Sequence, residues 1–216
     1  MNSASAAPEP QPVYAGQFVT LRTVARSDYP AFLRWRTSAG GRQARSSRPT
    51  PPAAAAFEAE MEAMLTQSIV LLAADAASGA PIGFVQAYNV NPADGWCMVR
   101  AHFEQAQRGR QPGTEAWFAL IDYLLGGFGL QKIYVDLPGF SSDVLEATVA
   151  GLFAEEGRFR EHTFFDGRYW DVVRLAVYRE AWPELRERIW FLLQVGGETA
   201  EVLADQRARE GAVATP

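Results

Sequence analysis

The chain has 216 residues, of which 48% are hydrophobic and 12% aromatic, so one substantial core with tails at its ends is expected. Its formal net charge of −5 disfavours nucleic acid and anionic membranes as partners. One cysteine and two histidines are too few for a disulfide framework or a zinc site, so no metal is expected.

The N-terminal segment is rich in Ser, Ala and Pro and contains too little apolar material to pack, so a disordered tail is expected over residues 1–13. It has no charged start followed by an apolar block, and no apolar run in the chain approaches the roughly 18 to 20 residues of a membrane span. A cytoplasmic location is therefore expected. Alternation then predicts a strand over 17–24, and capping residues before aromatic ones predict a helix over 27–36.

An arginine loop, residues 38–52, comes next and contains Arg42, Arg45 and Arg48 at intervals of three. Its Gly, Ser and Pro content is typical of a solvated loop. A flap over the acceptor, or a surface that meets an acidic partner, is the alternative. Residues 53–67 then have the apolar spacing of a helix.

Three alternating segments predict an antiparallel meander over 68–74, 81–88 and 95–103. The odd-numbered residues of the third segment are apolar and are expected to face the core. Its even-numbered residues are mixed in character and could line a cleft: Trp96, Met98, Arg100 and His102.

The meander leads into the stretch 105–125, a loop containing Gly and Arg that continues as an amphipathic helix. A helix start leaves backbone N–H groups unpaired and carries the positive end of the dipole, so phosphate oxygens are stabilised there. Gly109 and Gly113 allow close backbone approach, and Arg108 and Arg110 add permanent positive charge. The stretch is neither a P-loop nor a dinucleotide fingerprint, and its spacing also fits an ordinary connection.

Residues 131–137 predict a strand parallel to the third meander strand, since the helix between them would be a crossover. A capping box at Asp143 and Glu146 predicts a further helix. The Asp166-Gly167 pair predicts the turn of a closing β-hairpin.

A C-terminal helical extension is expected over residues 183–209, followed by a polar tail at 210–216. Leu185, Ile189 and Leu193 recur at helical spacing within it. This apolar stripe is expected to pack back on the domain, and a homodimer contact is its alternative use.

The loop, the first strand and helix, and the element order together resemble the GCN5-related N-acetyltransferases (GNAT), particularly their ribosomal-protein-acetyltransferase branch. Arg108-Gly-Arg-Gln-Pro-Gly113-Thr-Glu-Ala116 is similar to the family's acyl-CoA pyrophosphate loop, except that Gln111 replaces the first family glycine. The resemblance covers roughly residues 16–182. It implies a mixed α/β (α+β) fold whose central, mostly antiparallel sheet is flanked by helices, with the acyltransferase domain over 14–182.

The resemblance also implies an activity. Such an enzyme transfers an acyl group, expected to be acetyl, from a pantetheine thioester to an amine by direct attack, without a covalent enzyme intermediate. The thioester is expected to be acetyl-CoA or another acyl-CoA. The resemblance places the CoA-binding residues on the third meander strand and the following loop: Ala101, Phe103, Arg108, Gly109, Arg110, Gln111, Gly113 and Thr114.

His102 is the candidate general base, because it lies beside the expected thioester and an imidazole ordinarily titrates near pH 6.5. His162, Glu104 or a chain of waters could do the same work. The tyrosine that many family members use as general acid is missing here, and the family's asparagine falls on Ser141. Ser141 or Ser142 could therefore contact pantetheine or hold a water, or simply start a helix.

Two other functions stay open. The altered loop and the arginine loop would suit an acyl group delivered by a phosphopantetheinyl acyl carrier protein. The missing tyrosine and asparagine would suit a non-catalytic acyl-CoA-binding module. The acceptor is expected to be a small-molecule amine or a protein N-terminus, and Arg100 or Arg168 could bind a carboxylate on it, although exposed arginines are usually just solvated or paired.

Overall fold

The computed structural model describes residues 10–37, 53–107, 110–140 and 153–195. Several sequence-based expectations lie outside these ranges, namely the arginine loop, the capping box at Asp143 and the helical stretch after Val195. Four candidate site residues also lie outside them: Arg108, Gly109, Ser141 and Ser142.

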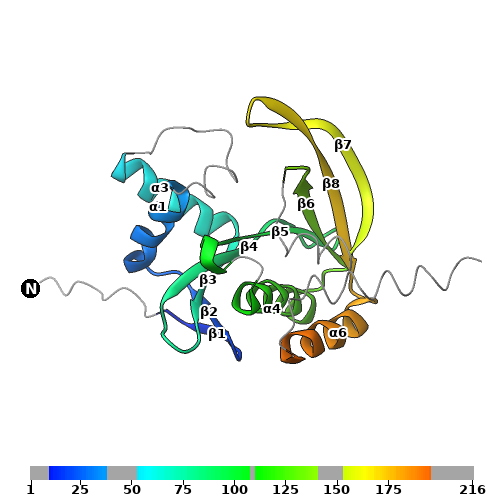
Figure 1. Ribbon diagram of the computed structural model, residues 1–216, viewed down its shortest axis with the longest axis horizontal. Helices are drawn as coiled ribbons and strands as arrows, with labels where there is room; N and C mark the ends of the chain where they lie inside the picture. Colours follow the sequence, from blue (N-terminus) through cyan, green and yellow to red (C-terminus); the bar gives the residue numbers. More distant parts are fainter. Residues whose placement is uncertain (1–9, 38–52, 108–109, 141–152, 196–216) are drawn as a thin grey trace, which may run out of the picture.

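An eight-stranded mixed sheet organises the described part of the chain, in the order β1-β2-β3-β4-β5-β6-β8-β7 (Figure 1). All neighbouring strands in it are antiparallel except β5 and β6. The first five strands are β1 (Pro12–Ala15), β2 (Val19–Thr23), β3 (Ile69–Asp75), β4 (Pro81–Asn91) and β5 (Trp96–Phe103). The mixed, mostly antiparallel sheet and the predicted meander are therefore confirmed.

The N-terminal boundary needs a correction. β1 begins at Pro12, so Pro12 and Val13 belong to the sheet, although the sequence analysis assigned them to a tail ending at residue 13. Pro12 pairs with Arg22 on β2, and Val13 packs against the main core. Strand pairing and burial hold this short segment in place. Its Pro-rich composition indicated neither the pairing nor the burial.

Two helices cover one face of the sheet, α1 (Tyr29–Thr37) and α3 (Ala54–Gln67), with a short 3-10 turn, η1 (Arg26–Asp28), before α1. Figure 1 shows them side by side, in blue and cyan. Their apolar side chains form a cluster with β3, which contains Tyr29, Phe32, Trp35, Phe57, Met61, Val70, Leu72 and Ala74. Both helices agree with the predicted ones.

The opposite face is covered by α4 (Gln111–Gly127) and α6 (Trp182–Val195) (Figure 1). The core on this side takes the odd-numbered residues of β5, including Cys97 and Val99, as the alternation predicted. Ile189 and Leu193 of α6 are buried in the same core, which confirms that the C-terminal stripe packs on the domain. None of the helices within the described ranges has the length and apolarity needed to cross a membrane.

The remaining strands are β6 (Lys132–Pro138), β7 (Ala154–Phe165) and β8 (Arg168–Tyr178). β6 is parallel to β5, and β7 and β8 form a long hairpin that curves away from the rest of the sheet (Figure 1). Asp166 and Gly167 both have positive φ angles, 49° and 78°, as a two-residue turn of the predicted kind requires. The parallel strand and the hairpin are therefore confirmed.

One buried carboxylate ties α4 to the first two strands. Glu115 is only 3% exposed, an uncommon position for a carboxylate. Its Oε2 accepts the backbone N–H groups of Phe18 and Val19 at 2.7 and 2.9 Å, and its Oε1 accepts that of Gln17 at 3.0 Å. The loop between β1 and β2 therefore depends on a side chain about 100 positions further along the chain.

A tyrosine and a glycine complete this contact. The Tyr14 hydroxyl donates to Glu115 Oε1 at 3.0 Å, and burial together with that carboxylate raises the pKa of Tyr14, so it keeps its proton. At Gly16 a Cβ would collide with the Glu115 carboxylate and would lie 2.5 Å from Tyr14 Cε1. Only glycine leaves enough space at this position.

Replacing Glu115 by Gln should lower the free energy of unfolding by about 2–4 kcal/mol, because an amide NH₂ would face backbone N–H groups that then lose their acceptor. Urea denaturation at constant slope measures the change. Glu58→Gln, which alters an exposed glutamate on α3, should shift the free energy by less than about 0.5 kcal/mol. Equal effects of the two substitutions would contradict the anchoring role of Glu115.

Candidate functional site

β5 and β6 part soon after they begin. They pair only from Trp96 to Met98 on β5 and from Lys132 to Tyr134 on β6. Beyond that point β6 continues along β8, whereas β5 continues along β4 (Figure 1). From Val99 onward, no strand of the described segments pairs with β5 on the β6 side.

The backbone direction along β5 shows which residues face this unpaired side. Glu104 donates its N–H to the carbonyl of Ile82 at 3.0 Å, so its backbone faces β4. Successive residues of an antiparallel pair alternate in this respect. Ala101 and Phe103 therefore direct their N–H and C=O groups away from β4, toward the side on which β5 is no longer paired with β6. An extended ligand can use such groups as a further strand would.

The start of α4 lies next to the end of β5. A short 3-10 turn, η2 (Gln105–Gln107), leads into this region, and Arg110, which is exposed, is the N-cap of α4. At Gly113 a Cβ would lie 3.0 Å from the carbonyl oxygen of Gln107 and 3.4 Å from the ring of Phe103. Glycine thus lets α4 begin close against β5. By helix geometry the first N–H groups of α4 have no partner within the helix, which suits an anion.

Two polar residues of this helix start make specific contacts. Gln111 stands where the family has a glycine, and its Nε2 donates to the carbonyl of Leu193 on α6 at 3.0 Å. Its side chain is thus directed toward α6. Thr114 is buried, and its hydroxyl donates to the carbonyl of Arg110 at 3.1 Å, which stiffens the first turn.

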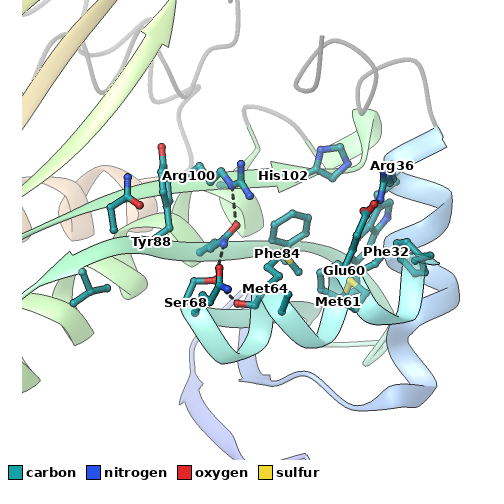
Figure 2. Close-up of a pocket in the computed structure, with 18 residues that line it drawn as sticks. Phe32, Arg36, Glu60, Met61, Met64, Ser68, Phe84, Tyr88, Arg100 and His102 are labelled. Atoms are coloured by element: carbon teal, nitrogen blue, oxygen red, sulfur yellow. Dashed lines mark hydrogen bonds and ion pairs between the residues drawn. The ribbon is translucent and has the colours of Figure 1, made fainter. Parts of the chain in front are cut away.

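A pocket of about 590 Å³ opens on the other face of the sheet, between α1, α3, β4 and β5 (Figure 2). Ala101 and His102 line it from β5. Ala101 therefore belongs to the pocket and to the unpaired side of β5 at the same time. Aromatic and thioether side chains form its apolar walls, namely Phe32, Trp35, Phe57, Met61, Met64 and Phe84.

A chain of hydrogen bonds crosses the floor of the pocket (Figure 2). The Ser68 hydroxyl donates to the carbonyl of Met64 and accepts from Gln86 Nε2 at 2.7 Å. This fixes the orientation of the Gln86 amide, so its oxygen accepts from Arg100 Nε at 2.7 Å. The guanidinium of Arg100 also lies over the ring of Tyr88, 5.2 Å from its centroid.

The surrounding protein shifts the pKa values of both Arg100 and Tyr88. Arg100 is exposed to the pocket, but the walls partly desolvate its guanidinium and lower its pKa. An arginine remains charged despite such a shift. Burial likewise raises the pKa of Tyr88, which keeps its phenolic proton.

The candidate bases occupy different places. His102 is half-buried in the pocket wall, with ring centroids 5.8 Å from Phe84 and 6.1 Å from Trp35. Glu104 accepts the indole N–H of Trp35 at 2.8 Å and is not among the residues that line the pocket. His162 lies on β7, is exposed and packs against Phe159. Of these candidates, the structure brings only His102 to the pocket.

The one cysteine is unsuited to nucleophilic catalysis. Cys97 is completely buried in the core, and that burial raises its pKa to about 12. No cluster of metal-binding side chains occurs in the described part of the chain. An acyl group therefore has no thiolate on this chain to which it could transfer.

Gln86 and Ser68 were not among the residues predicted from the sequence. Alternation along β4 places Gln86 on the same side as Phe84 and Tyr88. An amide in an otherwise apolar strand indicates that its side chain forms a hydrogen bond in the folded protein. Its partner could not be found from the sequence, because Arg100 and Ser68 lie on other elements.

Comparisons with known proteins agree with this geometry. A family model described as an acetyltransferase (GNAT) domain matches residues 19–137, whereas no curated protein matches. A GCN5-related N-acetyltransferase from Brucella melitensis has a TM-score of 0.72 and 21% identity, covering 92% of this chain and 96% of that one. A spermidine N-acetyltransferase from Vibrio cholerae in complex with CoA and spermine has a TM-score of 0.64 and 20% identity, covering 76% of this chain and 98% of that one. A ribosomal L7/L12 alpha-N-protein acetyltransferase has a TM-score of 0.65 and 14% identity, covering 78% of this chain and 94% of that one.

Gly83 should be essential for the end of β5. It pairs with Phe103, and a Cβ there would collide with the carbonyl oxygen of His102 and lie 2.5 Å from the Phe103 ring. Gly83→Ala should therefore lower the free energy of unfolding by about 1–3 kcal/mol. Urea denaturation measures this.

Gly157→Ala is the matched control, since a Cβ at that position on β7 meets no atom within 4 Å. Its free energy of unfolding should change by less than about 0.5 kcal/mol. A Gly83→Ala protein as stable as this control would show that β4 and β5 do not need their close approach.

Proposed function

The chain belongs to the GNAT family of acetyltransferases, and we propose that it transfers an acyl group, acetyl in the simplest case, from acyl-CoA to an amine. The acceptor binds in the pocket between α1, α3, β4 and β5. The observation that carries this proposal is the position of Ala101. Its backbone faces the side where β5 has lost its strand partner, and the residue also lines the pocket.

The donor binds along β5 and at the start of α4. The extended pantetheine arm takes hydrogen bonds from the backbone of β5 at Ala101 and Phe103, in place of the missing strand. The pyrophosphate binds at the first turn of α4, with Gly113, Thr114 and the charge of Arg110. Arg108 and Gly109, outside the described ranges, are proposed to complete this loop, as the family resemblance implies.

The reaction is a direct transfer. A neutral amine attacks the thioester carbonyl, a C–N bond forms, and the N–H groups at the β5 edge stabilise the charge on the carbonyl oxygen. Collapse of this intermediate breaks the C–S bond, and the CoA thiolate leaves and takes up a proton. His102 accepts the proton that the amine loses, directly or through a water.

Acyl-CoA is favoured as donor over an acyl carrier protein. Gln111 replaces the family glycine, but its side chain is held by the Leu193 carbonyl on α6. This contact supports an accessible helix start for the pyrophosphate. Membership of the family makes the chain an acyltransferase, so the non-catalytic module is not retained. The solved relatives named above act on spermidine and on a protein N-terminus, so both small amines and peptide N-termini are acceptor classes to test.

Replacing Arg110 by Ala should weaken acetyl-CoA binding by about 5- to 10-fold, because an exposed cation contributes roughly 1 kcal/mol to a charge-assisted contact. Isothermal titration with acetyl-CoA measures this. Arg160→Ala, which removes an exposed arginine on β7, should leave the affinity unchanged. If the unaltered protein binds neither acetyl-CoA nor CoA, the proposed donor is wrong, and acyl-loaded carrier protein becomes the donor to test.

Replacing His102 by Gln should lower kcat/KM for the amine by about 10²- to 10⁴-fold and remove the acidic limb of the pH–rate profile. Acetyl-CoA affinity should stay within about threefold, since a base acts on the amine and not on the donor. His162→Gln is the control and should behave like the unaltered protein. A His102→Gln enzyme that keeps its rate and its profile would assign proton removal to water.

A further inference from the structure

Arg100 brings a positive charge into the acceptor pocket, and we propose that it binds a carboxylate of the acceptor. The substrate is then an amine that also carries a carboxylate, in particular an amino acid with an apolar side chain. This inference rests on the proposed function, because it names the substrate class of the same pocket.

The guanidinium of Arg100 is oriented but not neutralised. Gln86, itself 3% exposed, accepts only from Nε, which leaves the N–H groups of the two terminal nitrogens for a ligand. No carboxylate of the described residues lies within 4.0 Å of it. A planar pair of terminal nitrogens matches the two oxygens of a carboxylate.

Two partly buried arginines, Arg22 and Arg174, do have carboxylate partners. Arg22 pairs with Asp28 at 2.7 Å, and Arg174 pairs with Asp136 at 2.7 Å. Within the same pocket, the Glu60 carboxylate forms an ion pair with Arg36. Among the residues that the structure describes, the partly desolvated charge of Arg100 contacts an amide oxygen and the face of Tyr88 but no carboxylate. Such a charge is stabilised by an anion that enters with the substrate.

The position of Arg100 suits an amino acid. Arg100 and His102 are two residues apart on the same face of β5, which separates their Cα atoms by about 7 Å. A carboxylate on Arg100 therefore leaves an amine in the same molecule close to Ala101 and His102, where the thioester is proposed to lie. Phe84, Met64 and other apolar side chains form one part of the pocket wall, which suits an apolar substituent.

The first experiment compares three acceptors that share one ring and one amine: phenylalanine, phenylalaninamide and phenethylamine. Acetyl transfer to phenylalanine should be favoured by about 10- to 100-fold in kcat/KM, mainly through KM, because only phenylalanine offers a carboxylate. Spermidine, which brings only positive charge, should be a poor acceptor. Equal or better use of the amide or of phenethylamine would overturn the proposal.

Two substitutions test the residue itself. Arg100→Gln removes the cation, and Gln86→Glu keeps it but supplies an internal carboxylate of nearly the same shape. Within each variant, the ratio of kcat/KM for phenylalanine to that for phenethylamine should fall from about 10–100 to about 1. Arg168→Gln is the matched control, since Arg168 stacks on Trp170 in the β7–β8 hairpin and should not alter the preference. A preference that survives both substitutions would show that Arg100 does not bind the carboxylate.

Direct binding separates this inference from the proposed function. Transfer to phenethylamine without a preference for phenylalanine would refute the carboxylate site and leave the acyltransferase proposal intact. If no amine is acetylated, titration of phenylalanine and phenethylamine against the unaltered protein and Arg100→Gln still decides the question. Binding that requires both the carboxylate and Arg100 supports the site, and absence of such binding up to the solubility limit refutes it.

Discussion

The geometry of this protein depends on the buried carboxylate of Glu115. It accepts three backbone N–H groups of the β1–β2 connection and the hydroxyl of Tyr14, so helix α4 cannot shift relative to the first strands without leaving those donors unpaired in the core. Because the same helix begins beside the end of β5, the contact also fixes the proposed phosphate-binding turn against the sheet. The stability of this packing and the proposed donor binding therefore depend on the same residue.

β5 and β6 diverge because each of them pairs with a different strand on its other side. β6 is held along its whole length by β8, whereas β5 is held by β4, and the right-handed twist of a sheet carries such strands apart. One edge of β5 is then left without a ladder. On the same strand Cys97, Val99 and Phe103 lie in the core, whereas Arg100 and His102 line the pocket on the opposite face; Trp96 and Met98, predicted on that face too, do not line it. In the proposed function, β5 therefore separates the donor site from the acceptor pocket by the thickness of a single strand.

The pocket illustrates how a fixed charge can select a substrate. The direction of each hydrogen bond from Ser68 to Arg100 is determined by the one before it, because a hydroxyl has a single proton to donate. This chain orients a guanidinium but cannot neutralise it. A ligand without an anion leaves the oriented cation in an apolar pocket without a partner, and the free-energy cost of this disfavours its binding. A larger apolar contact area alone does not provide such discrimination between ligands.

The sequence by itself determined the order of the elements, the core face of β5, the helix within the stretch 105–125 and the turn at Asp166-Gly167, because periodicity and turn chemistry are local properties. His102 was a candidate base in the sequence, and the structure places its side chain in the pocket lining. Only the tertiary structure decided that Glu115 is buried, that Pro12 joins the sheet and that Gln86 orients Arg100. Each of these contacts joins residues on different elements, and burial and hydrogen-bond partners across such distances are set by packing, which no local pattern encodes.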